Sequence, residues 1–309
     1  MSRIEMRSSI LRLARVFLFL LSMFVSLSAQ RSRHVVIVVL DGARYTETFG
    51  DSSHSNIPLI WSQLRPYGTI YTSFWNDGTT WTISGHASIL SGNRESLKND
   101  GSEPPHSPTI FEYYRQQTGA PAGACWVALG KTKLQMLSLS EHAEYGAAYC
   151  ASVKTSDSEY DDRIAIENTR FALLTNHPAI TIVNLPATDE FAHDNKWGGY
   201  IGAIKEADTL VTLLWNTIQS DSMLRDSTTL ILVNDHGRHT KDFTDHGDHC
   251  EGCAHIMLLI IGPDTPAGKV DSDARKQVDI APTVGMLLGF KTPYSVGNVI
   301  KSAGQDSRR

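Results

Sequence analysis

The stretch His34–Leu40, HVVIVVL, ends directly in Asp41. A continuous β-branched run of this kind is typical of a strand that is buried on both faces of a parallel sheet. Open parallel sheets bind their ligands at the carboxyl ends of the strands. We therefore expect Asp41 at the edge of the sheet that carries a site.

Outward from this strand, strand-like and helix-like segments alternate. Further strands are expected at Gly68–Phe74, Ala124–Leu129, Ala179–Leu185, Thr228–Val233 and Ile256–Ile261. Helices are expected at Ile57–Leu64, Thr82–Ser91, Thr109–Gln116, Asp161–Leu174, Ile201–Ile218 and Asp279–Leu288, with a polar loop at Ser152–Asp162. This alternation predicts an α/β fold with a mostly parallel central sheet and helices on both faces.

Composition narrows the class of protein. The chain has 309 residues, of which 41% are hydrophobic and 20% charged, so it can bury a core and is not disordered as a whole. A net charge of −5 leaves no basic footprint for a nucleic-acid-binding module. The body of the chain has no apolar run of about 20 residues, so no transmembrane domain is expected in the mature protein.

The amino terminus has the layout of a cleaved secretory signal. Basic residues precede an apolar run from Val16 to Leu27, and small residues follow it. About twelve apolar residues span about 18 Å as a helix, which is short of a bilayer core of about 30 Å. We expect a signal peptide at residues 1–29, export to the periplasm or the medium, and one domain at residues 30–309.

Export sets the redox context of the four cysteines, Cys125, Cys150, Cys250 and Cys253. An oxidising compartment permits any of the three pairings. The favoured pairs are Cys250 with Cys253 and Cys125 with Cys150, although spacing alone does not decide between the three.

The ends of three strong strands carry side chains that bind metals: Asp41, then Asp189 with His193, and Asp235-His236 with the later His246. Mixed oxygen and nitrogen ligands suit zinc, and manganese less well. Six ligands are too many for one tetrahedral ion and suit two. Three buried carboxylates would also repel one another unless cations neutralised them. A single aspartate at a strand end usually caps a turn, but the repetition with histidines favours a metal centre.

A second motif, Thr82-Ile83-Ser84-Gly85-His86, opens a predicted helix. A hydroxyl at a helix start is most often an N-cap. Beside a metal, the same hydroxyl is a candidate nucleophile, because the helix dipole stabilises negative charge there. The segment alone leaves both interpretations open. His86 is expected to be packed or to support a ligand rather than to bind a metal itself.

These motifs occur in the order used by the alkaline phosphatase superfamily. The chain resembles that superfamily from about Val35 to Ile300, and it looks closest to the type I phosphodiesterase/nucleotide pyrophosphatase branch. The tail VDIAPTVGMLLGF is similar to a closing helix of the same superfamily. The resemblance implies an alkaline phosphatase-like hydrolytic domain that holds two Zn²⁺ ions, with Mn²⁺ as an alternative.

Carried over residue by residue, the resemblance assigns one ion to Asp189, His193 and His246. It assigns the other ion to Asp41, Asp235, His236 and the hydroxyl oxygen of Thr82. The implied function is an exported two-zinc phosphoric ester hydrolase of the phosphodiesterase or phosphatase type. It would act on a small-molecule phosphate ester through a phospho-threonine intermediate at Thr82, the catalytic residue.

The chain departs from the phosphodiesterase pattern at one position. Gly85 stands where those enzymes have an asparagine that donates to the phosphoryl group, and Gly-His at this spacing resembles the phosphoglycerate mutase branch. Lys131 and Lys133 are candidate substitutes, because their spacing is similar to a stretch in phosphonoacetate hydrolases. Lysines after a strand are more often solvated.

Alternative functions remain at this point. The sulfatase signature, a Cys or Ser before x-Pro-x-Arg, is absent, yet a phosphonate or sulfate ester hydrolase of the same superfamily and a catalytically silent metal-binding module are both alternatives. A separate zinc knot could form from His246, His249, Cys250, Cys253 and His255. Arg238 and His239 follow the Asp-His-Gly turn, and no pattern assigns them a role.

Overall fold

The computed structural model describes residues 32–155 and 158–304. The predicted signal peptide, residues 1–29, lies outside the described residues. Within them, no helix is both long enough and apolar enough to cross a bilayer.

Nine strands form one sheet in the described part of the chain. At its centre, β1 (His34–Leu40) pairs in parallel with β5 (Ile180–Leu185) and β6 (Thr228–Val233). The full order is β4 (Ser152–Thr155), β3 (Cys125–Leu129), β5, β1, β6, β7 (His255–Ile261), β2 (Gly68–Trp75) and β8 (Lys269–Asp271), with β9 (Arg275–Lys276) beside β2. Only β7 runs against its neighbours among the described strands, which confirms the prediction of a mostly parallel sheet.

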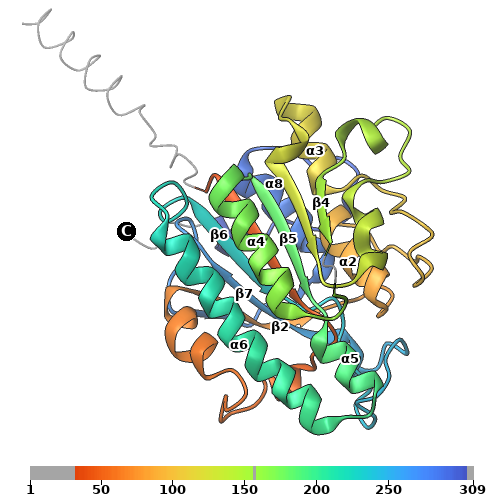
Figure 1. The fold of residues 1–309 in the computed structure, drawn as a ribbon, viewed down its shortest axis with the longest axis vertical. Coiled ribbons are helices and arrows are strands. Elements are labelled where there is room, and N and C mark those ends of the chain that lie inside the picture. Colours follow the sequence, from red (N-terminus) through yellow and green to blue (C-terminus); the bar gives the residue numbers. More distant parts are fainter. Residues whose placement is uncertain (1–31, 156–157, 305–309) are drawn as a thin grey trace, which may run out of the picture.

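Helices cover both faces of this sheet (Figure 1). They are α2 (Thr82–Ser91), α3 (Ile110–Thr118), α4 (Asp162–Asn176), α5 (Ala187–His193), α6 (Trp197–Ser220), α7 (Glu251–Ala254) and α8 (Ile280–Leu288). Alternate residues of β1 point into two separate cores. Val35, Ile37 and Val39 join the core under α2, α3 and α8, whereas Val36, Val38 and Leu40 join the core under α4 and α6. Burial on both faces explains why this strand is apolar without alternation.

Local structure differs from the sequence-based expectations in three places. The helix predicted for Ile57–Leu64 is mostly a π-helical turn at Ile60–Leu64, and the carboxylate of Asp208 accepts hydrogen bonds from the backbone N–H of Leu59 (3.0 Å) and Ile60 (2.7 Å). The predicted polar loop at Ser152–Asp162 begins with the edge strand β4. The short helix α5 was not predicted, because seven residues are too few to show a helical period.

The reversed strand β7 determines where the connection after β6 lies. The strands β1, β5 and β6 end at one edge of the sheet, and β7 begins at that same edge because it is antiparallel to β6. Residues 234–254 therefore connect β6 to β7 without crossing the sheet. This connection contains Asp235, His236 and His246 from the predicted metal-ligand set.

A buried carboxylic acid joins α4 to the start of α5. One carboxylate oxygen of Asp162 accepts a hydrogen bond from the backbone N–H of Ala187 (3.0 Å), and the other has no hydrogen-bond partner among the described residues. Burial raises the pKa of Asp162 from 3.8 to about 7.

This pKa predicts a loss of stability with rising pH. Between pH 4 and 7 the folded protein holds a proton that the unfolded chain has released, so the free energy of unfolding falls over this range by on the order of a few kcal/mol. The variant Asp162→Asn should keep the bond to Ala187 and lose this dependence. We expect the thermal midpoint of Asp162→Asn minus that of the wild type to be larger at pH 8 than at pH 5. An unchanged difference at the two pH values would contradict the shifted pKa.

Candidate active site

Asp41 stands at the end of β1, in a turn that its neighbours hold tightly. Asn184 of β5 donates to its carboxylate (3.0 Å), and the hydroxyl of Thr188 donates to its backbone carbonyl. Gly42 follows with a positive φ of 66°, and a Cβ there would lie 2.8 Å from atoms of both Arg238 and Asp189. Glycine is therefore required at this position for conformation and for space.

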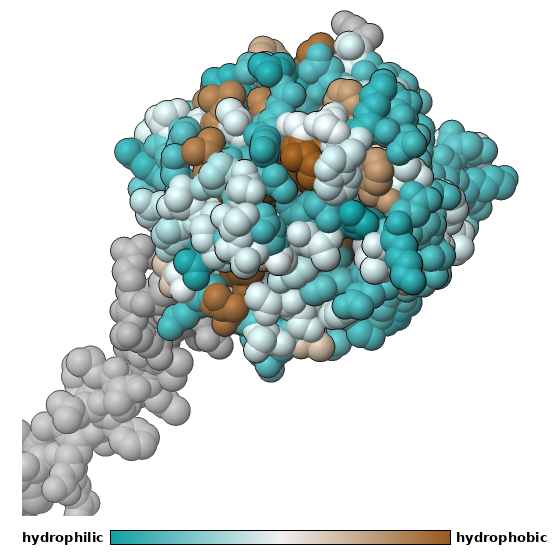
Figure 2. Space-filling model, turned by 90° about the horizontal axis from the view of Figure 1, so that it is seen from below, coloured by the Kyte–Doolittle hydropathy of each residue, from teal (hydrophilic) through white to brown (hydrophobic). Residues whose placement is uncertain are grey.

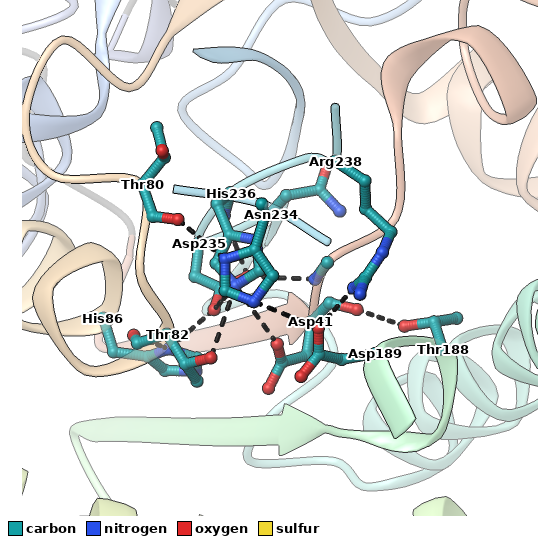
Figure 3. Close-up of polar contacts among 12 residues, drawn as sticks. Asp41, Thr80, Thr82, His86, Thr188, Asp189, Asn234, Asp235, His236 and Arg238 are labelled. Atoms are coloured by element: carbon teal, nitrogen blue, oxygen red, sulfur yellow. Dashed lines mark hydrogen bonds and ion pairs between the residues drawn. The ribbon is translucent and has the colours of Figure 1, made fainter. Parts of the chain in front are cut away.

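The first group of ligand-type side chains gathers around His236. Its Nε2 atom lies 3.6 Å from a carboxylate oxygen of Asp41, 3.3 Å from one of Asp235 and 3.3 Å from the hydroxyl oxygen of Thr82. All four side chains are buried (Figure 3). The structure thus brings together the whole set that the sequence assigned to the second ion.

The second group consists of Asp189, His193 and His246. Asp189 and His193 are four residues apart on α5, so they share one helix face, with 3.3 Å between the carboxylate oxygen and Nε2. His246 reaches the same place from the β6–β7 connection, with its Nε2 atom 3.2 Å from that of His193 and 3.7 Å from Asp189. His193 is the exposed member, since 41% of its side chain is accessible.

Hydrogen bonds set the tautomers of the two buried histidines. Nδ1 of His236 lies 2.8 Å from the carbonyl of Gly237, and Nδ1 of His246 lies 2.9 Å from the carbonyl of Thr80. A carbonyl can only accept, so each Nδ1 carries the proton and each Nε2 presents a lone pair to the carboxylates. Burial lowers the pKa of both imidazoles, so both are neutral, as metal binding requires.

The carboxylates carry more negative charge than their hydrogen bonds satisfy. One oxygen of Asp41 and one of Asp235 are buried with no hydrogen-bond partner among the described residues. Burial, together with the charge of Asp41, raises the pKa of Asp235 to about 6. Two triads of possible ligands, Asp41-Asp235-His236 and Asp189-His236-His246, each lie within 4.8 Å. The orphaned oxygens and the mixed oxygen and nitrogen donors fit a pair of divalent cations.

The chain is similar in sequence or in fold to several known proteins. The sequence model of the Metalloenzyme superfamily matches residues 143–292. A phosphonate monoester hydrolase from Silicibacter pomeroyi has 14% identity and a TM-score of 0.64, over 89% of this chain and 77% of that one. A 2-O GAG sulfatase has 13% identity and a TM-score of 0.68, over 90% and 76% of the two chains. No curated protein matches the chain.

A protein of the alkaline phosphatase superfamily from Vibrio parahaemolyticus has 14% identity and a TM-score of 0.66, over 88% of this chain and 70% of that one. The fold is that of the alkaline phosphatase superfamily. The resemblance drawn from the sequence motifs is thereby confirmed at the level of the fold. The comparisons do not single out its type I phosphodiesterase branch.

Of the two candidate lysines, the structure places only Lys131 among the carboxylates of this site. Its ammonium nitrogen lies 2.9 Å from Asp41 and 2.6 Å from Asp189, and its side chain is buried. Burial alone would lower the pKa of Lys131, but the two carboxylates outweigh it and raise that pKa. Lys133 is partly buried and instead donates to the carbonyl of Asn99 (3.2 Å).

Arg238 is a site residue that the sequence did not reveal. Its side chain is fully buried, and its guanidinium donates to Asp189 and to the carbonyls of Phe243 and Thr244. It therefore fixes a metal-ligand candidate to the connection that carries His246 (Figure 3). The sequence shows an arginine directly after an Asp-His-Gly turn, but it does not show which side chains that arginine contacts in the fold.

The missing asparagine has a steric explanation. A Cβ at Gly85 would lie 2.5 Å from the carbonyl oxygen of Asp235, because α2 packs directly on that backbone. No larger side chain fits there without moving Asp235. His86 supports the cluster, as expected, since its Nδ1 atom lies 2.8 Å from the carbonyl of Thr82 and 3.3 Å from the carboxylate of Asp235.

Neither the alternative zinc knot nor the favoured disulfides are found in the described residues. His246 belongs to the carboxylate cluster, and His255 stacks between Tyr45 (3.9 Å between ring centroids) and Trp75 (4.4 Å). All four cysteines are free, so neither the Cys250–Cys253 nor the Cys125–Cys150 pair is formed. The two members of Cys250-x-x-Cys253 lie instead near His239, which sequence reasoning had left without a role.

The surface around this edge of the sheet is mainly polar. Figure 2 views the molecule from the end where α5 lies in Figure 1, and the exposed apolar side chains there are scattered among hydrophilic ones. Trp81, which is 37% exposed, packs edge-on against His246 (4.9 Å between ring centroids). The site thus borders a hydrophilic surface.

The position of Lys131 predicts a metal-dependent stability defect. In Lys131→Met the carboxylates of Asp41 and Asp189 lose their ammonium partner, which should cost about 3–5 kcal/mol without metal. Added zinc should reduce this loss, because cations then neutralise the carboxylates. Thermal unfolding with chelator and with zinc measures both values, and Lys133→Met serves as the control. An equal loss of stability with chelator and with zinc would show that metal does not replace Lys131 as the partner of these carboxylates.

Proposed function

We propose that the protein is a metal-dependent hydrolase of phosphoric esters, with Thr82 as nucleophile and two divalent ions, Zn²⁺ first and Mn²⁺ as the alternative. One observation carries the proposal: the buried hydroxyl of Thr82 lies 3.3 Å from Nε2 of His236, beside carboxylate oxygens without hydrogen-bond partners. Asp41, Asp235, His236 and Thr82 would hold one ion, and Asp189, His193 and His246 the other.

The reaction follows from what these side chains can do. Thr82 Oγ1 attacks phosphorus, forming the Oγ1–P bond as the bond to the leaving oxygen breaks, and the hydroxyl proton passes to the leaving group. Water then attacks the phosphorus of the phospho-threonine, its oxygen leaves with the released phosphate, and a proton of the water restores the hydroxyl. Divalent ions at such sites lower the pKa of a hydroxyl and stabilise the charge that develops on the transferred group. Thr82 is the first residue of α2, so the helix dipole adds favourable potential there.

Positively charged side chains among the carboxylates favour an anionic small-molecule substrate. Lys131 supplies a buried ammonium, and we propose that it contacts the substrate group once metals neutralise its carboxylate partners. Lys133, bonded to a carbonyl, is the weaker candidate. Packing excludes an asparagine at position 85, which supports the assignment of the donor role to a residue outside α2.

Hydrolysis of a phosphonate or sulfate ester is the second candidate. Its support is the similarity in fold to a phosphonate monoester hydrolase and to a 2-O GAG sulfatase. The segment Thr82-Ile83-Ser84-Gly85-His86 lacks the sulfatase signature, which favours phosphoric esters. Rates on bis-aryl phosphate, mono-aryl phosphate, aryl phosphonate and aryl sulfate with zinc would rank the activities.

Replacing the nucleophile tests the covalent mechanism. Thr82→Ala should lower kcat for the best aryl substrate by at least about 10³-fold, because the attacking oxygen is lost. Thr82→Ser keeps that oxygen and should retain measurable activity. Ser88→Ala, which removes another buried hydroxyl of α2, is the matched control and should leave kcat close to the wild type. Full activity in Thr82→Ala would refute the mechanism, and an inactive wild type that binds metal would favour the silent metal-binding module.

We also propose that the protein is exported. The support is the sequence of residues 1–29 alone. Amino-terminal sequencing of the protein recovered outside the cytoplasm should begin at Ala29 or Gln30. Recovery only in the cytoplasm with Met1 retained would contradict export.

A further inference from the structure

A second group of metal-binding side chains lies in the β6–β7 connection, outside the carboxylate cluster. It consists of His239, Asp248, Cys250 and Cys253, which we call the thiol cluster. His239 comes just after the buried Arg238, and the two cysteines flank the start of the short helix α7. One atom from each of the four residues lies within 4.8 Å of the others.

The contacts in the thiol cluster converge on His239. Its Nδ1 atom lies 3.3 Å from the sulfur of Cys253, 3.9 Å from the sulfur of Cys250 and 2.8 Å from a carboxylate oxygen of Asp248. Ligands about 2.0–2.3 Å from a tetrahedral zinc ion lie about 3.3–3.8 Å from one another. The nitrogen–sulfur distances therefore already approximate the edges of such a tetrahedron.

The donor types select the metal. Two sulfurs, one imidazole nitrogen and one carboxylate oxygen form a four-coordinate set that suits zinc, whereas magnesium and calcium prefer oxygen alone. Four protein ligands also close the coordination sphere, which is the property of a structural rather than a catalytic site. Cys253 is fully buried, while Asp248 is 53% exposed, so the cluster has a dry side and a side open to an entering ion.

The backbone holds the ligands in place independently of any ion. The carbonyl of Cys250 accepts hydrogen bonds from the N–H groups of Cys253 and Ala254 (2.9 Å each). The N–H of Gly252 donates to the hydroxyl of Thr240 (3.1 Å), and the carbonyl of Cys253 accepts from Gly237 (2.8 Å). Both ends of the loop that contains His246 are thus joined at the thiol cluster.

We propose that His239, Asp248, Cys250 and Cys253 bind a third zinc ion that fixes the loop carrying His246. This site does not depend on the proposed hydrolytic activity. It assigns the cysteines as thiolate ligands rather than as a disulfide, and its ligand set differs from that of the alternative zinc knot considered from the sequence.

Sulfur provides a readout specific to this site, because the proposed catalytic ligands contain none. Chelator-treated protein is titrated with Co²⁺ alone, and we expect a thiolate-to-cobalt charge-transfer band whose final intensity corresponds to one thiolate-bound Co²⁺ per chain. The zinc form should show zinc–sulfur scattering at about 2.3 Å in X-ray absorption. Both signals should vanish in the double variant Cys250→Ser/Cys253→Ser. His239→Ala keeps both sulfurs but removes one ligand. It should raise the Co²⁺ dissociation constant, measured from the intensity of the band, at least about tenfold.

Matched controls separate this proposal from the proposed function. Cys150→Ser removes a thiol outside the cluster, and Thr82→Ala removes the nucleophile, so both should keep the band. Circular dichroism checks that each variant folds. Absence of any metal–sulfur signal in the wild type, or a Cys250–Cys253 disulfide in metal-supplemented protein, would overturn the third site. A wild type that shows the band but hydrolyses none of the ester substrates would instead count against the catalytic assignment alone.

Discussion

Three carboxylates buried in one place are the constraint on which the rest of the structure depends. Asp41, Asp189 and Asp235 come from different strand ends and are at most 4% exposed. Their mutual repulsion in a region of low dielectric would oppose folding without opposite charge nearby. Lys131 and Arg238 supply that charge within the chain. Much of the local structure, including the glycine turn at Gly42, keeps these groups in contact.

The reversal of β7 keeps the whole segment after β6 at the edge of the sheet where the candidate ligands lie. In an all-parallel sheet the segment after β6 would have to cross to the opposite edge before the next strand. Here it stays, and it delivers Asp235 and His236 to one group, His246 to the other and the cysteines of the thiol cluster beyond them. Arg238 links this connection to α5 through Asp189. A single antiparallel strand therefore keeps three candidate ligands of the carboxylate cluster and the whole thiol cluster in one connection beside that edge.

The sequence predicted well what depends on local pattern. Apolar runs identified the central strands, and the residues directly after them, such as Asp41 and Asp235, gave candidate ligands that lie together in the structure. It failed where the partner is distant along the chain. Arg238 is recognisable only beside Asp189, Asn184 reads as an unremarkable polar residue within a buried strand, and His239 has meaning only near Cys253. Gly85 illustrates a third case. The backbone of Asp235 leaves no space for a side chain at this position, so the residue must be glycine.

The ion pairs of Lys131 have a consequence for how the protein matures. Because an internal ammonium already balances Asp41 and Asp189, the chain can reach its compact state before any metal arrives. Folding and metallation are then separate events, and entering ions at the proposed centre compete with a tethered cation for the same oxygens. Such competition weakens the apparent affinity of the site for every ion. Metals that bind weakly would then fail to displace the lysine, so the site would be occupied only by metals that bind tightly.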